Sequence, residues 1–260
     1  MKIVRFIAVA ALLAALLGGC GSDNSADEST TSSTEVTSTS DESTTTTEST
    51  TTASSDTTTS ESSTTSSQSS SSSVPTLEQP AIWPSPGVVF DDPETAAADF
   101  VSKVFGVPPN LGEFQQGDAR SGEIEVLSPA EGGGTSIRSV LLLRQLGPDD
   151  GWFILAAVSD TNTITAPASG GQVPAGSVEV AGQGRGFEGL LVVEAFPAGQ
   201  ATRLDQQQAQ GGSTEATEPY SVTLDLSGAG LGEPVLILVR GGVGLETDTG
   251  EFSAIPVTIG

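Results

Sequence analysis

The chain has 260 residues and a formal net charge of −24 at pH 7, with 33 acidic residues, 9 basic residues, 1 cysteine and no histidine. Nucleic-acid binding needs a basic patch that displaces counterions, so this charge argues against a nucleic-acid partner. Without histidine, the chain cannot form a Ser-His or Cys-His nucleophilic centre or an imidazole metal site. We therefore expect neither an enzyme nor a protein that binds a cofactor or a metal.

Residues 1–19 have the organisation of a signal peptide. Lys2 and Arg5 form a positive region, and Ile7–Leu17 is an apolar stretch too short to span a membrane. The run Leu17-Gly18-Gly19-Cys20 then resembles the lipobox of bacterial lipoproteins. The resemblance implies cleavage before Cys20 and acyl chains such as palmitate, which hold the protein on the extracytoplasmic face of a bacterial cell membrane. The alternative is a chance cysteine beside an ordinary cleavage site.

Residues 20–73 are predicted to be a disordered tether. After Cys20 the segment is almost entirely Ser, Thr, Asp and Glu, and it contains no Lys, Arg or aromatic residue. Such a composition cannot bury enough surface to offset the entropy of ordering. A flexible coil of about 50 residues spans roughly 40 Å on average, which suits a stalk. The dense Ser and Thr also permit O-glycosylation, and a plain spacer is the alternative.

Residues 74–90 contain 4 prolines, which favour an extended path. Trp83 and Val88–Phe90 are the apolar anchors of this segment. We expect a linker whose end docks onto the fold that follows, with Trp83 covering an edge of the core. The alternative is that Trp83 binds a ligand.

Residues 91–161 predict a small α+β domain, with one helix on an antiparallel sheet. Asp92 is a good N-cap residue, Pro93 suits the first helical position, and Gly106 ends the helix. Ser139–Leu146 and Trp152–Ser159 flank turn residues and predict a hairpin. The helical face should carry Ala97, Phe100, Val101, Val104 and Phe105, and the core should include Phe100, Phe105, Leu141, Leu143, Trp152 and Ile154.

Residues 162–260 predict an all-β sandwich of about seven short strands. The polar run Asp160–Thr163 marks the boundary, and we expect a fragment beginning near Asn162 to fold alone because each side has its own apolar residues. The expected strands are Thr163–Ala166, Ser177–Gly182, Leu190–Phe196, Ala201–Gln208, Tyr220–Leu226, Val235–Arg240 and Ile255–Ile259.

Short motifs in this part resemble the immunoglobulin-like domain named for bacterial spore germination proteins, over roughly Ile164–Gly260. The resemblance implies an immunoglobulin-like fold that mediates interactions at the cell envelope, and no enzymatic residue set belongs to that family. The matching elements are Ile164-Thr165-Ala166-Pro167, Gly170 with Val173, Val178–Gly182, Gly186-Phe187-Glu188-Gly189, Pro219-Tyr220 and Ile255-Pro256-Val257.

Three local motifs have alternative interpretations. Gly182–Gly186 resembles a phosphate-binding loop, but it lacks a lysine and a following helix, which favours a glycine-rich turn. At Phe187 and Glu188, the favoured interpretation is that Phe187 enters the core while Glu188 bonds a nearby turn or Arg185. Contact of this pair with a partner is the alternative. Glu246, Asp248 and Glu251 alternate like Ca²⁺ ligands but lack the full loop pattern.

Together these features predict a lipid-anchored cell-envelope protein that presents an immunoglobulin-like interaction module on a flexible stalk. Its expected partner is another envelope protein or a wall polymer, besides the membrane itself through Cys20. The alternative function is an extracytoplasmic small-ligand-binding lipoprotein, in which the α+β domain holds an apolar molecule between helix and sheet. A filled space between helix and sheet favours the first function, and a cavity of a few hundred cubic ångströms favours the second.

The Cys20→Ser substitution tests the anchor. It removes the thiol to which the lipid would be attached, so the variant should move from the detergent phase to the aqueous phase in Triton X-114 partition of cells. A variant that stays wholly in the detergent phase would show that Cys20 is not the anchor.

Overall fold

The computed structural model describes residues 77–130, 133–213, 216–243 and 245–260. The predicted signal peptide, Cys20, the predicted tether and residues 74–76 of the linker lie outside the described residues. The described chain is mostly antiparallel β-sheet with one short α-helix, as predicted at that level. No helix within these ranges is long and apolar enough to cross a membrane.

The helix α1 (Pro93–Phe100) begins as the sequence predicts, and helical structure ends at Gly106 as predicted, although its last turn is not α-helical. The carboxylate of Asp92 accepts a hydrogen bond from the backbone N–H of Thr95 at 2.8 Å, which caps the first turn. A π-helical turn, Val101–Phe105, continues the helix. Gly106 then ends it with a φ of 71°, a left-handed conformation that glycine adopts without strain.

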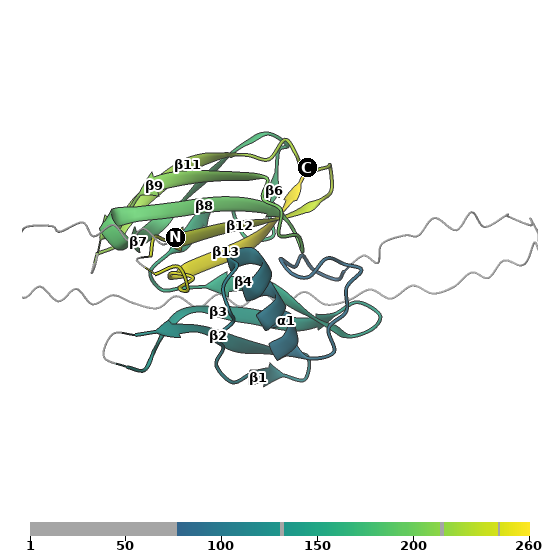
Figure 1. Ribbon diagram of the computed structural model, residues 1–260. Helices are drawn as coiled ribbons and strands as arrows, with labels where there is room; N and C mark the ends of the chain where they lie inside the picture. The colour runs from purple at the N-terminus through teal and green to yellow at the C-terminus, as the bar shows by residue number, and fades with distance from the viewer. Residues whose placement is uncertain (1–76, 131–132, 214–215, 244) are drawn as a thin grey trace, which may run out of the picture. The chain divides into compact units, whose positions relative to one another are not determined.

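The larger sheet has nine strands in the order β1-β2-β3-β4-β13-β12-β8-β9, and β6 pairs in parallel with β13 (Figure 1). The predicted hairpin is confirmed as β3 and β4. The strands are β1 (Gln115–Asp118), β2 (Ser121–Pro129), β3 (Thr135–Leu146), β4 (Gly151–Val158), β6 (Gln172–Val173), β8 (Leu190–Pro197), β9 (Asp205–Gln210), β12 (Pro234–Gly241) and β13 (Phe252–Ile259).

A smaller sheet of four strands faces one part of the larger sheet. Its strand β7 pairs with three others: antiparallel with β11 and β5, and parallel with β10. The strands are β5 (Thr163–Ala166), β7 (Ser177–Gly186), β10 (Gly212–Ser213) and β11 (Glu218–Asp225).

The seven strands expected after Asn162 all occur, β5 with the expected bounds and the others with shifted ends. The largest shifts are in β9, which begins at Asp205 rather than at Ala201, and in β7, which ends at Gly186 rather than at Gly182. The sequence does not indicate β1, β6 or β10. These strands are two to four residues long, and β1 is exposed along its length, so none carries an alternation of apolar residues.

A helix-side core lies between α1 and one face of the larger sheet (Figure 1). Phe100 is fully buried and makes edge contacts with Trp83 and Phe105, whose ring centroid in turn lies 4.6 Å from that of Phe252. The six predicted core residues all belong to this core, with Phe105 partly buried. Large side chains therefore fill the space between the helix and the sheet.

Strands β8, β12 and β13 are buried on both faces. In β12, Leu236 and Leu238 point into the helix-side core, whereas Val235, Ile237 and Val239 point into an inter-sheet core against β7 and β11. Because side chains alternate along a strand, a continuous apolar run lets one strand contribute to two cores. The three strands form a middle layer between the helix and the smaller sheet.

The prediction of separate apolar sets on either side of Asn162 is therefore wrong for these strands. Phe196, Leu236, Leu238 and Phe252 all follow Asn162 in the chain, yet they pack in the helix-side core with residues that precede it. A fragment that begins at Asn162 would expose these side chains to water. Its independent folding, and the boundary itself, stay predictions.

The described part of the linker docks closely onto the fold. Trp83 is buried rather than available to a ligand, and its indole Nε1 donates to Asp99 at 3.0 Å. The backbone N–H of Ile82 donates to the carbonyl of Ile154, and the carbonyl of Ile82 accepts from the N–H of Gly199. The segment therefore contacts both the β3–β4 hairpin and the loop after β8. By contrast, Val88 and Val89, which we expected to be apolar anchors, are about half exposed: 45% and 46%.

Candidate functional site

An open groove of about 850 Å³ lies where the end of the β2–β3 hairpin, the turn after β7 and the β12–β13 loop meet. We call it the junction groove. It is defined by Ser136 and Arg138 of β3, Arg185 and Gly186 at the end of β7, Phe187 and Glu188 after it, Gly241 to Val243, Leu245, Asp248, Gly250 and Glu251. It therefore combines residues from both sides of the predicted boundary at Asn162.

Asn162 lies at the point where the chain leaves the larger sheet for the smaller one. Its side chain is fully buried. The amide Nδ2 donates to the carbonyl of Glu251 at 2.6 Å, and Oδ1 accepts from the backbone N–H of Arg185 at 2.8 Å. A polar side chain is buried here at low cost because both ends of the amide have partners. The predicted polar junction is thus a buried link between β5, β7 and the start of β13.

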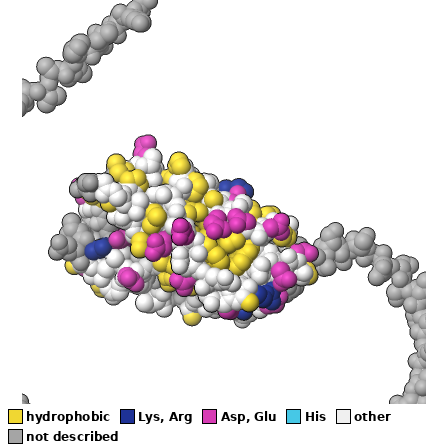
Figure 2. Space-filling model, turned by 90° about the horizontal axis from the view of Figure 1, so that it is seen from below, with side chains coloured by type: hydrophobic (Ala, Val, Ile, Leu, Met, Phe, Trp, Pro, Cys, Tyr) yellow, Lys and Arg dark blue, Asp and Glu magenta, His cyan; other side chains and the backbone are white. Residues whose placement is uncertain are grey.

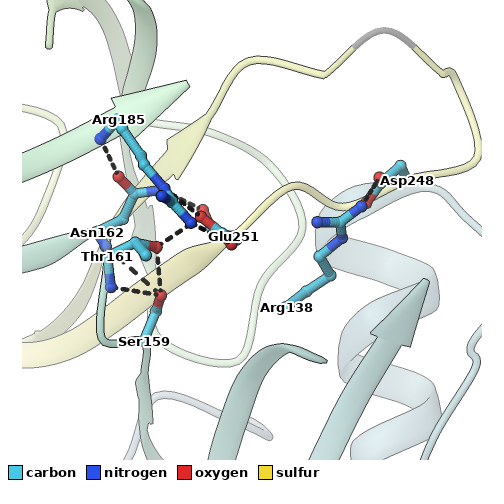
Figure 3. A network of polar contacts seen from close by, with 7 residues as sticks. All are labelled: Arg138, Ser159, Thr161, Asn162, Arg185, Asp248 and Glu251. Carbon is cyan, nitrogen blue, oxygen red and sulfur yellow. Dashed lines mark hydrogen bonds and ion pairs between the residues drawn. The ribbon is translucent and has the colours of Figure 1, made fainter. Parts of the chain in front are cut away.

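An ion pair lies beside this link on the floor of the groove (Figure 3). The guanidinium of Arg185 donates from Nε and Nη2 to the carboxylate of Glu251, both at 3.3 Å. The hydroxyl of Thr161 donates to the same carboxylate at 2.7 Å. Desolvation by burial raises the pKa of Glu251, but the hydrogen bonds from Arg185 and Thr161, with the charges of Arg185 and Arg138, outweigh it and hold the pKa below 4.5.

A second ion pair joins β3 to the β12–β13 loop. Arg138 donates to Asp248, which also accepts from the hydroxyl of Ser128 at 2.7 Å and from the backbone N–H of Gly250 at 2.9 Å. Both carboxylate oxygens of Asp248 are thus occupied by protein donors. This removes the support for Ca²⁺ at Glu246, Asp248 and Glu251, and no cluster of three or more Asp, Glu, His or Cys occurs among the described residues.

The glycine-rich run Gly182–Gly186 is part of strand β7, so it is neither a phosphate-binding loop nor a turn. The three glycines alternate, which places them on one face of the strand. A Cβ at Gly182 would lie 1.8 Å from the carbonyl oxygen of Thr163, and one at Gly186 would lie 2.0 Å from that of Leu190. Glycine is therefore required here by the close approach of neighbouring backbone, which explains the spacing without a ligand.

Phe187 and Glu188 form a tight turn, Phe187–Gly189, at the rim of the groove. The expectation that Phe187 enters the core is wrong, since its side chain is 61% exposed. Glu188 is also exposed, and its carboxylate makes no hydrogen bond or ion pair with any described residue. Arg185, its expected partner, pairs with Glu251 instead. The pair thus faces solvent.

The turn is held firmly despite its exposure. The N–H of Phe187 donates to the carbonyl of Gly242 at 3.0 Å, and the N–H of Gly242 donates to the carbonyl of Leu190 at 2.7 Å. Glu188 has a φ of 54°, a left-handed conformation that costs a residue with a Cβ about 1–2 kcal/mol. The surrounding hydrogen bonds therefore maintain a strained backbone that directs an aromatic ring outward.

Every Lys and Arg of the described residues lies in an ion pair. The pairs are Lys103–Asp99, Arg120–Asp150, Arg138–Asp248, Arg144–Asp118, Arg185–Glu251, Arg203–Glu194 and Arg240–Glu194. Figure 2 shows the same relation on one face, where the few basic side chains lie near more numerous acidic ones. The described surface thus offers an anionic partner no unpaired cation.

Of the residues that the sequence indicates as candidates, Phe187, Glu188, Asp248 and Glu251 line one groove, and Glu246 is not part of its lining. The sequence does not indicate Arg138 or the role of Asn162. Arg138 is one of a few scattered arginines, and its partner Asp248 is 110 positions away. The polarity of Asn162 resembles that of any loop residue, so only the fold reveals its burial.

Comparison of the whole chain with protein-family models, with curated proteins and with solved structures found no match.

The Glu251→Gln substitution tests the ion pair through pH. Because folding lowers the pKa of Glu251, its carboxylate stabilises the fold above pH 4.5, and this contribution is lost as pH falls through the lowered pKa. Urea denaturation should show the variant less stable than the wild type by about 1–2 kcal/mol at pH 7, with the difference shrinking at pH 3. Glu123→Gln, at an exposed site, is the control. A deficit of Glu251→Gln that is equal at both pH values would contradict the pairing.

Proposed function

We propose that this chain is a bacterial cell-envelope protein, anchored by lipid at Cys20, that binds another envelope protein or a wall polymer at the junction groove. In this proposal residues 162–260 act as an immunoglobulin-like module, and residues 20–73 act as a flexible stalk. The protein is a binding protein rather than an enzyme. The observation that carries the binding role is the exposed ring of Phe187 on a strained, hydrogen-bonded turn at the rim of the groove.

Support for the immunoglobulin-like part comes from the inter-sheet core. Side chains of β8, β12 and β13 pack against those of β7 and β11, as in a sandwich of two sheets. Tyr220 of β11 adds a link, because its buried hydroxyl donates to the carbonyl of Thr163 in β5 at 2.9 Å. The burial raises the pKa of Tyr220, so this hydroxyl stays protonated and able to donate.

The alternative of a small apolar ligand between helix and sheet has less support. That space holds the fully buried side chains of Phe100, Leu141, Leu143 and Ile154. A ligand pocket typically offers several hundred cubic ångströms to its ligand. The junction groove has a volume of that order, and it lies away from α1.

Site-specific photo-crosslinking in the host tests the binding role. A photoreactive phenylalanine analogue replaces Phe187 in the full-length protein, and the same analogue replaces Leu231, an apolar residue that is 84% exposed outside the groove. Illumination of living cells should yield an adduct with a defined envelope component from position 187 and not from position 231. Equal yields from both positions, or none from position 187, would contradict the proposal.

A further inference from the structure

The rim of the junction groove presents apolar side chains that the fold does not use. Phe187 is 61% exposed and Leu245 is 59% exposed, and Val243 is also part of the lining. Burying one such side chain against a partner stabilises a complex by about 1.5–3 kcal/mol. The rim can therefore supply binding energy to a partner that carries apolar groups of its own.

Five ionised side chains of the described residues line the groove. Arg138 and Arg185 each have a carboxylate partner, Asp248 and Glu251 respectively. Glu188 remains, with an exposed carboxylate that pairs with no described cation. The described lining of the groove is thus left with one uncompensated negative charge, on the residue next to Phe187.

This arrangement of charges favours a cationic partner over an anionic one. An anionic group entering the groove would meet the carboxylate of Glu188, and the two arginines are already paired with Asp248 and Glu251. A Lys or Arg side chain would instead pair with Glu188 and place its aliphatic stem or its cation against the Phe187 ring. An apolar neighbour on the same segment would cover Leu245 and Val243. Complementary charge beside apolar contact is the usual basis of specificity in protein interfaces.

We infer that the junction groove docks a polypeptide segment of another envelope protein in which Lys or Arg alternates with apolar residues. The inference rests on the proposed function of the groove and names its class of partner. A polypeptide fits better than a wall polymer, because the rim offers apolar surface and one carboxylate rather than a dense set of hydrogen-bonding side chains for sugars.

Peptide binding to the purified protein tests this inference. The probes are three short capped peptides in which Lys alternates with Leu, Glu alternates with Leu, and Lys alternates with Ser. At physiological ionic strength, fluorescence anisotropy should show binding of the Lys-Leu peptide and at least about tenfold weaker binding of the other two. Failure of the Lys-Leu peptide to bind, or equal binding of the Glu-Leu peptide, would overturn the inference.

Matched variants locate the site. Phe187→Ser should weaken binding of the Lys-Leu peptide about tenfold or more, and Phe187→Leu should retain most of it. Glu188→Gln should weaken binding about threefold. The controls Leu231→Ser and Glu123→Gln, at exposed sites outside the groove, should leave the affinity unchanged. If the controls weaken binding as much as the groove variants, the peptide binds by general attraction to an acidic protein and the inference is wrong.

A further probe separates this inference from the proposed function. Soluble wall fragments that bind the wild type and not Phe187→Ser would overturn the polypeptide partner while leaving the groove as the binding site. A crosslink from position 187 in cells, together with no binding of the Lys-Leu peptide, would likewise overturn the polypeptide partner and leave the groove as the binding site. Loss of the crosslink itself would reject the proposed function as well.

Discussion

The buried amide of Asn162 holds together the strands that meet where the chain passes from one sheet to the other. It bonds the backbone of Arg185 in β7 and of Glu251 just before β13, two segments that are 66 positions apart and whose side chains also pair. An amide buried with both ends satisfied fixes the relative position of its neighbours, because breaking either bond leaves a polar group without water. The geometry of the junction groove depends on this link, since Arg185 and Glu251 form its floor.

The middle layer of β8, β12 and β13 connects the strands that Asn162 holds together to the rest of the described residues. The larger sheet continues from the β3–β4 hairpin to β13 and the strands beyond it through a single residue pair, Ala157 of β4 and Ala254 of β13. So narrow a connection would be weak by itself. It is reinforced by Phe252, which packs against Phe105 on the helix side, and by the bond from the N–H of Ser159 to the hydroxyl of Ser253. The packing of Phe252 and the hydrogen bond of Ser253 thus both stabilise the point where β4 meets β13.

Much of the secondary structure could be predicted because it is encoded locally. Asp92, Pro93 and Gly106 determine where the helix begins and ends, and the Val- and Leu-rich run in Ser139–Leu146 identifies a strand whatever its partner. The arrangement of strands could not be predicted in the same way. The apolar run Val235–Val239 indicates a strand in the sequence. Only the elements packed on its two faces show that its side chains contribute to two cores.

The sequence indicates some of the residues that line the groove but not the groove itself, for the same reason. Phe187 in a Gly-Phe-Glu-Gly motif is an apolar residue beside a strand, and such residues usually enter a core. Here Gly186 and Gly189 allow the chain to approach its neighbours so closely that the ring is directed outward. The exposure of Phe187 is a result of backbone packing over long sequence distances. No local sequence pattern indicates this exposure.

Native-state hydrogen exchange of the full-length protein tests most directly whether the middle layer joins the described part into one folding unit. The amides of Leu141 in β3, Ile237 in β12 and Val222 in β11 would be followed as denaturant is raised below the unfolding transition. We expect their opening free energies to converge on the same value, because each strand depends on the shared layer. If Val222 stays protected under conditions in which Leu141 exchanges freely, the two sides unfold separately and the middle layer does not join them into one folding unit.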